Sequence, residues 1–277
     1  MKPDLFKYDD YRLFLKDQCA YLKGQVAGFN YTMLAQQAGV SKTLLTLVMR
    51  GERRLTARAI DKILPLLKLT AKEQKYFRLL CRFTDAADQA EKSAALAELS
   101  RLSGFQKHHP KESEAFQYLS KWFYVAIREL TADPEFKLSA EWIQKKLVKP
   151  VPLLEIEAAI EFLKRTGFIE VLPDGRVLPP NKEIDCMADV YKTSLLKFYN
   201  EVFSLALEQL PRIEPERKHL VGHTVALSNE KFQEVRQILD KALQDVIALA
   251  SEDSKPETVF QVSLLGFPMT AARGGES

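Results

Sequence analysis

Polar side chains suited to binding a polyanion gather between residues 42 and 54 of this 277-residue chain. Lys42, Thr43 and Thr46 are spaced to face outward from a short helix. A Gly-centred cationic loop, RGERR at residues 50–54, follows directly behind that helix. Outward polar groups on a short helix are the geometry of a recognition helix, and cationic loops clamp phosphate. The spacing therefore indicates binding to DNA.

Two short helices and a tight turn must position these side chains. Gly39 ends the first helix, at a position where glycine adopts a left-handed backbone at little cost. Ser41 is a suitable N-cap for the second helix, Thr56 for a third and Thr70 for a fourth. Apolar residues at helical spacing form the inward faces of the first two helices, and they are Leu34, Ala35, Ala38, Leu45 and Val48.

The run YTMLAQQAGVSKTLLTLVMRGERRL, residues 31–55, resembles the lambda-repressor-like, or Xre-type, helix-turn-helix family. The signature of that family is a helix, then Gly-Val-Ser, then a helix that ends at a Gly-containing loop. The resemblance covers about residues 30–80 and implies two sets of contacts with double-stranded DNA. The base edges would be approached by Lys42, Thr43 and Thr46, and the phosphates would be contacted by Arg50, Arg53 and Arg54.

The charge of the chain is divided unevenly. Residues 1–84 contain sixteen Lys and Arg against seven Asp and Glu, a net charge of +9. Because the whole chain carries +3, residues 85–277 carry −6. A basic module joined to an acidic body is expected when one end holds a polyanion and the other does not.

Composition and the remaining motifs limit the other classes of function. No apolar run approaches the length of a membrane span and no signal-peptide core is present, so we expect a cytoplasmic protein without a membrane partner. Three isolated cysteines indicate neither a disulfide framework nor a metal site. His219 and His223 would lie about 13 Å apart in a strand, too far to share a metal. No enzymatic motif is present, and we expect no enzyme, no cofactor and no metal.

The fold class that the sequence predicts is mainly α with small β. We expect a helix-turn-helix domain over residues 1–84 and a connecting helix and linker over 85–112, ending in the loop SGFQKHHP. A winged-helix-like domain is expected over 113–186 and a C-terminal dimerisation or sensing region over 187–277. The winged helix is predicted from three helices followed by two short strands around a Pro-Asp-Gly turn. Glu155, Glu157 and Glu161 would repel phosphates, so we expect a protein-contact or scaffold role there.

The C-terminal region is predicted to be a long helix followed by a strand–helix–strand unit. HLVGHTVALS alternates like a strand, Ser228 caps a helix, and TVFQVSLLGFP is strand-like again. Two strands and one helix cannot close a core, so the unit must pack on the long helix, on the winged helix or on a second chain. A homodimer is the preferred solution, because it presents two recognition helices to a two-fold operator.

The motifs KWFYVAIREL, EAAIEFLKRTGFIEV and VFQVSLLGFPMT resemble an uncharacterised bacterial family that joins a helix-turn-helix to a C-terminal winged-helix-containing region. The resemblance implies a transcriptional regulator and names no effector, whether small molecule or protein. Two hypotheses follow: a dimeric DNA-binding regulator, or an interaction adaptor in which the helix-turn-helix binds protein. Leu44 and Leu47 bear on the second, because DNA readers often carry polar residues at these positions.

Overall fold

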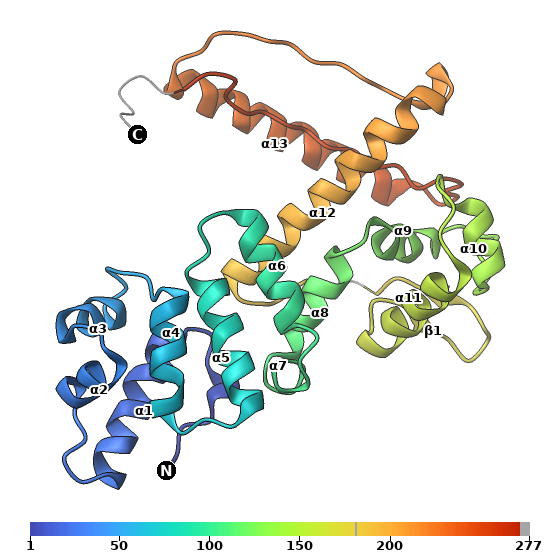
Figure 1. The fold of residues 1–277 in the computed structure, drawn as a ribbon. Helices are drawn as coiled ribbons and strands as arrows, with labels where there is room; N and C mark the ends of the chain where they lie inside the picture. Colours follow the sequence, from blue (N-terminus) through green and yellow to red (C-terminus); the bar gives the residue numbers. More distant parts are fainter. Residues whose placement is uncertain (181, 272–277) are drawn as a thin grey trace. The chain divides into compact units, whose positions relative to one another are not determined.

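The computed structural model describes residues 1–180 and 182–271. Helices make up 62% of the described residues and strands 1%, so this part of the protein is mainly α with a small β part, as predicted. The chain divides into two compact units (Figure 1). Unit 1 comprises Met1–Trp122 and Glu183–Ser204, and unit 2 comprises Phe123–Lys182 and the chain from Leu205 onward.

Unit 1 is built from helices. Its elements are η1 Leu5–Lys7, α1 Tyr11–Gln25, α2 Tyr31–Ala38, α3 Lys42–Met49, α4 Ala57–Ile63, η2 Leu64–Leu67, α5 Ala71–Thr84, α6 Gln89–Leu99, α7 Ser103–His108, α8 Pro110–Leu119 and the first part of α12 Ala188–Gln209. The predicted caps are confirmed: the side chains of Ser41, Thr56 and Thr70 each accept a backbone N–H of the helix that follows. At α5 the cap is reciprocal, because Glu73 also accepts the N–H of Thr70 at 2.7 Å.

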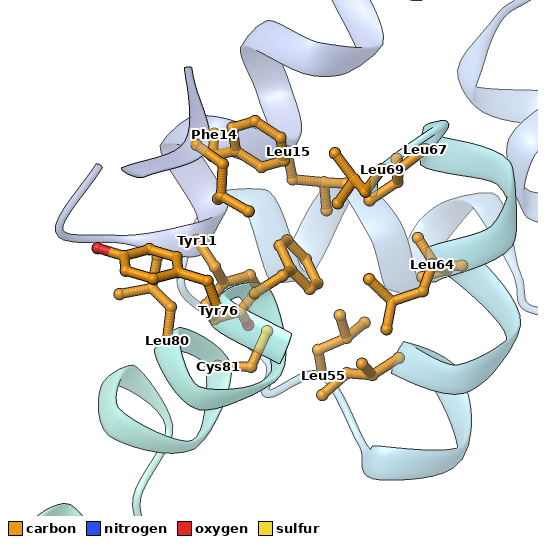
Figure 2. Close-up of a cluster of buried hydrophobic side chains, with 14 of the residues drawn as sticks. Tyr11, Phe14, Leu15, Leu55, Leu64, Leu67, Leu69, Tyr76, Leu80 and Cys81 are labelled. Carbon is orange, nitrogen blue, oxygen red and sulfur yellow. The ribbon is translucent and has the colours of Figure 1, made fainter. Parts of the chain in front are cut away.

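The core of unit 1 joins α1, η2 and α5 (Figure 2). Large side chains from these elements, and Leu55 from the loop before α4, converge there and are almost fully removed from solvent. Those of the three elements include Tyr11, Phe14, Leu15, Leu64, Leu67, Tyr76, Leu80 and Cys81. The predicted inward faces of α2 and α3 are buried as well. The helix-turn-helix is therefore fixed to a rigid support.

Residues 85–112, expected as a connecting helix and linker, pack into this same core. Ala95, Leu96 and Leu99 of α6 are fully buried, and Phe105 of α7 is nearly so. The run SGFQKHHP, expected as a loop, contains helix α7. The first compact unit therefore does not end at residue 84, where we expected the domain boundary. The short Ala-rich helix α6 buries its apolar stripe against α5 and so belongs to unit 1.

A buried carboxylate at the end of α5 ties three parts of unit 1 together. The side chain of Asp85 is 8% exposed and forms an ion pair with Arg12 of α1. It also accepts the Tyr11 hydroxyl at 2.7 Å and the backbone N–H of Leu55, just before α4, at 3.0 Å. Burial, and then this hydrogen bond, raise the pKa of Tyr11 above its usual value.

Unit 2 begins with three helices and a hairpin in the predicted order. Its elements are α9 Trp122–Leu130, α10 Ala140–Lys146, α11 Leu153–Thr166, β1 Glu170–Val171, β2 Val177–Leu178, the end of α12, η3 Leu210–Arg212, η4 Pro215–Arg217 and α13 Asn229–Glu252. β1 and β2 are antiparallel, with Val171 opposite Val177, around the predicted Pro-Asp-Gly turn. Gly167 ends α11 with φ +71, as its position in the sequence predicts.

The two strands predicted to flank α13 are not formed in the described residues. The predicted segments 219–228 and 258–268 contain neither helix nor strand, and neither makes backbone hydrogen bonds to another strand in the part of the chain that the structure covers. The strand–helix–strand prediction was therefore wrong for a single chain, although α13 and its Ser228 cap are confirmed. An alternating pattern of apolar residues predicts an extended backbone, but a β-strand forms only where a second strand is present to share its backbone hydrogen bonds. Among the described residues, no helix combines the length and apolar character that a membrane span requires.

Asp85→Ala is expected to destabilise unit 1 by about 3–5 kcal/mol, because it removes the closer of the two carboxylates of the partly buried Arg12 guanidinium and leaves only Asp10, at 3.4 Å. It also takes the acceptor from two further donors in the core. Asp61→Ala is the matched control, since Asp61 and its partner Arg78 are both about half exposed. The control should cost about 1 kcal/mol or less. Urea denaturation of both variants measures the difference, and equal losses would contradict the role assigned to Asp85.

Candidate nucleic-acid interface

Helix α2 ends at a glycine with a left-handed backbone, here called a glycine stop, which turns the chain toward α3. Gly39 has φ +59, and its N–H donates to the carbonyl of Gln36 at 3.0 Å. The N–H of Val40 donates to the carbonyl of Ala35 at 2.9 Å, which completes a Schellman motif. α3 then begins within two residues, capped by Ser41. The predicted helix, turn and helix are thus present, on the outer side of unit 1 (Figure 1).

Helix α3 ends in the same motif. Gly51 has φ +79, and its N–H donates to the carbonyl of Val48 at 2.9 Å. The N–H of Glu52 donates to the carbonyl of Leu47, also at 2.9 Å. The sequence indicated Gly51 only as the centre of a loop. In the structure Gly51 is the residue that stops α3 and turns the chain toward Arg53 and Arg54.

The three residues predicted to contact bases all lie on α3, but they differ in their exposure to solvent and in the hydrogen-bonding groups they have available. Lys42 and Thr43 are exposed on its first turn. Thr46 is half-buried one turn later, and its hydroxyl donates to the carbonyl of Lys42 at 3.1 Å. The donor of Thr46 is therefore occupied within the helix. Its methyl group and the lone pairs of its oxygen remain for an outside contact.

The three predicted phosphate-contacting arginines are exposed at the end of α3 and beyond it. Arg50 is the C-cap residue of α3, while Arg53 and Arg54 follow the glycine stop. The N–H of the next residue, Leu55, is the one held by Asp85. The C-terminal end of the cationic loop, residues 50–54, is therefore anchored to the core, although its arginines extend into solvent. We call this segment the basic loop.

Two further cations, missed in the sequence, extend this surface onto α4. Arg58 and Lys62 are exposed there. The Lys62 side chain extends to the turn between α2 and α3, beside Gly39. A Cβ built on Gly39 would lie 3.2 Å from the Lys62 ammonium nitrogen. The signal available in the sequence was the continuation of basic residues beyond Thr56. We define the basic surface as Lys42, Arg50, Arg53, Arg54, Arg58 and Lys62.

The basic surface carries little compensating charge. Residues 30–62 include two carboxylates, and one of them, Asp61, is paired with Arg78 of α5. Within the described part of the chain, no carboxylate lies in ion-pair range of any cation of the basic surface. These cations are therefore available to an external anion.

Leu44, one of the two leucines that depart from the helix-turn-helix pattern, has a structural role. It is partly buried and packs against the core of unit 1. Leu47 is also partly covered, and its carbonyl accepts the N–H of Glu52. The position of Leu44 is thus explained by packing and does not call for a partner chain.

No other part of the described chain has the groups of a chemical site. Among the described residues, no group of three or more His, Cys, Asp or Glu side chains is placed to hold a metal ion. A hollow of about 470 Å³ in unit 2 is lined by Lys164, Gly167, Ile169, Glu170, Val171 and Pro180. Two ionisable side chains in a mainly apolar lining do not form a convergent polar set.

Gly51→Ala is expected to destabilise unit 1 by about 1–2 kcal/mol, because an L side chain is disfavoured at φ +79. Gly24→Ala is the matched control, since Gly24 lies in α1 with open space around it. It should stabilise the protein by about 0.5–1 kcal/mol. Thermal unfolding of both variants tests the glycine stop, and a neutral Gly51→Ala would contradict it.

Comparison with known proteins places most of the chain in one family. A family model described as a domain of unknown function, DUF4423, matches residues 102–269. The match begins directly before α7, so α1 to α6 and the basic surface lie outside it. No curated protein and no solved structure matches the chain. Because the match covers more than half of the sequence, the chain belongs to the DUF4423 family.

Proposed function

We propose that this protein is a non-enzymatic, DNA-binding transcriptional regulator that reads double-stranded DNA with α2 and α3 and acts as a homodimer. The observation that carries the proposal is the basic surface. Its cations lie at both ends of α3 and on α4, and none of them forms an ion pair with a carboxylate in the described chain. This arrangement suits the phosphates on either side of a groove that holds a helix.

The position of Lys42 at the start of α3 supports a role in binding a ligand and not in stabilising the helix. A cation at a helix N-terminus opposes the macrodipole and costs about 0.3–1 kcal/mol. Lys42 is the first residue of α3 and is exposed, so it does not serve helix stability. Arg50 differs, because a cation at the C-terminus of a helix is favourable there. Lys42 therefore distinguishes ligand binding from helix stabilisation more clearly than Arg50 does.

The proposed contacts follow from exposure and available groups. Lys42 and Thr43 donate to base edges in the major groove, where each base pair presents a distinct pattern. Thr46, with its donor occupied, contacts a thymine methyl group or accepts from a base amino group. The phosphate contacts are assigned to Arg50, Arg53 and Arg54, and Lys62 adds a cation at the turn.

Unit 2 is proposed to act as a scaffold or protein-contact domain, with its helices and hairpin in a winged-helix arrangement. The helix that would enter the groove, α11, exposes Glu155, Glu157 and Glu161. Of these, Glu161 is partly neutralised by Lys164 at 3.0 Å. The remaining carboxylates repel phosphates, so α11 is a poor candidate for DNA.

Replacing Arg53 and Arg54 together by alanine should weaken DNA binding and lower the slope of log affinity against log salt by about 2, because each phosphate contact contributes about 0.9. Arg101→Ala with Lys107→Ala is the matched control, since it removes two exposed cations of unit 1 outside the basic surface. The control should leave the slope unchanged. A salt series by fluorescence anisotropy measures all three proteins, and a slope near zero for the wild type would favour an adaptor.

Lys42→Ala should change which base is preferred at one position of each half-site, at a cost of about 1–3 kcal/mol for the original base. Selection from a random duplex pool with wild type and variant shows the change directly. Arg53→Ala is the control, because loss of a phosphate contact weakens all sequences alike. An unaltered motif in Lys42→Ala would exclude α3 as the reading helix.

A further inference from the structure

The C-terminal part of unit 2 contains no buried side chain. From Pro211 to Ala271, every described residue is exposed or half-exposed. Of the 27 large apolar side chains that are exposed in the described chain, fifteen lie between Leu220 and Met269. Exposed apolar side chains in such density mark a surface that is covered in the working state.

Helix α13 has an apolar stripe that a single chain covers incompletely. The stripe consists of Phe232, Val235, Leu239, Ala242, Val246 and Leu249, and none of these residues is buried. The segment after the helix runs back along it (Figure 1). A Cβ built on Gly266 would lie 3.3 Å from the Phe232 ring and 3.9 Å from Leu239. One extended segment thus touches the stripe without enclosing it.

The two extended segments have the composition of paired strands. Residues 219–227 and 258–269 are rich in apolar and β-branched residues and include no Lys, Arg, Asp or Glu. Exposed strand edges in monomeric proteins are usually guarded by charged residues. Both segments lack such guards, and in the described chain their backbone groups are not paired with another strand.

We propose that residues 219–269 of two copies of this chain form one shared module. The extended segments of one chain pair as β-strands with those of its partner, and the sheet lies between the two α13 helices, so that the face turned away from a chain's own α13 is covered by the α13 of its partner. The choice of a second copy as the occupant rests on the proposed function, because a two-fold operator requires two recognition helices.

Area and charge support a second copy as the occupant. The fifteen exposed apolar residues average more than half exposure, which amounts to on the order of 1,000 Å² per chain and exceeds the roughly 800 Å² that each partner contributes to a stable interface. The segments are uncharged, so two copies meet without like-charge repulsion. The same neutrality makes them unsuited to a polyanion.

Side-chain alternation identifies a position for the test. Because successive residues of an extended segment point to opposite faces and Gly266 lies against α13, Leu265 and Phe267 point away from the helix. Leu265 is 62% exposed in the single chain. A charge at this position is tolerated by the monomer and is buried by the proposed pairing.

Sedimentation velocity of the full chain without DNA tests the proposal. The wild type should sediment as a species of twice the 31.6 kDa chain mass. Leu265→Asp should weaken the dimer by about 100-fold or more, because it buries an unpaired carboxylate. The matched control is Leu154→Asp on α11, where Leu154 is 79% exposed outside the module, and it should remain dimeric.

Hydrogen exchange supplies a backbone measurement. Amides of residues 258–267 should be protected in the wild-type dimer and unprotected in Leu265→Asp, while α1 and α5 stay protected in both. A monomeric wild type, or a dimer that Leu265→Asp leaves intact, would overturn the proposal. DNA binding by a monomeric wild type would refute the shared module and the homodimer but leave DNA reading by α2 and α3 standing. A wild-type dimer that binds no DNA would refute the DNA-binding function and leave the shared module standing.

Discussion

The buried carboxylate of Asp85 is the constraint on which the geometry of unit 1 depends. It brings the start of α1, the entry to α4 and the end of α5 to one point, through Arg12, Tyr11 and the N–H of Leu55. An ion pair removed from solvent is costly unless its remaining hydrogen-bonding groups are satisfied. Because Leu55 directly follows Arg54, the placement of the basic loop is determined by this core interaction more than by the loop's own contacts.

Two glycine stops then convert a fixed core into a defined surface. Gly39 and Gly51 end α2 and α3 with the same hydrogen-bond pattern, so both the direction of α3 and the exit of the chain from it are set by backbone geometry. The cations of the basic surface make no ion pair in the described chain, so they take no part in holding this geometry. A surface whose cations form no ion pair in the described chain stays net positive, with Glu52 as the carboxylate of its loop, and so attracts an anion.

Local features of the sequence were sufficient to predict the helices and their ends. The N-caps at Ser41, Thr56, Thr70 and Ser228, the inward faces of α2 and α3, and the helix after Ser228 follow from spacing within a few residues. Features that join distant residues could not be predicted. Asp85 meets Arg12 across 73 positions, and α6 looks like a solvated Ala-rich helix until its contact with α5 is known. The predicted strands did not form for the same reason, because an alternating apolar pattern does not identify a partner strand.

At the candidate site, the sequence was sufficient to predict the exposed arginines. The occupied hydroxyl of Thr46 and the position of the Lys62 side chain depend on side-chain packing and could not be predicted.

The absence of buried side chains from Pro211 to Ala271 has a kinetic consequence. Since opening α13 in a single chain breaks little packing, this end is accessible to proteases whenever it is uncovered. If a second copy covers it, folding of the region becomes second order in protein concentration. Newly made chains at low abundance would then be degraded faster than chains that have met a partner. The lifetime of the protein would in this way depend on how much of it is present.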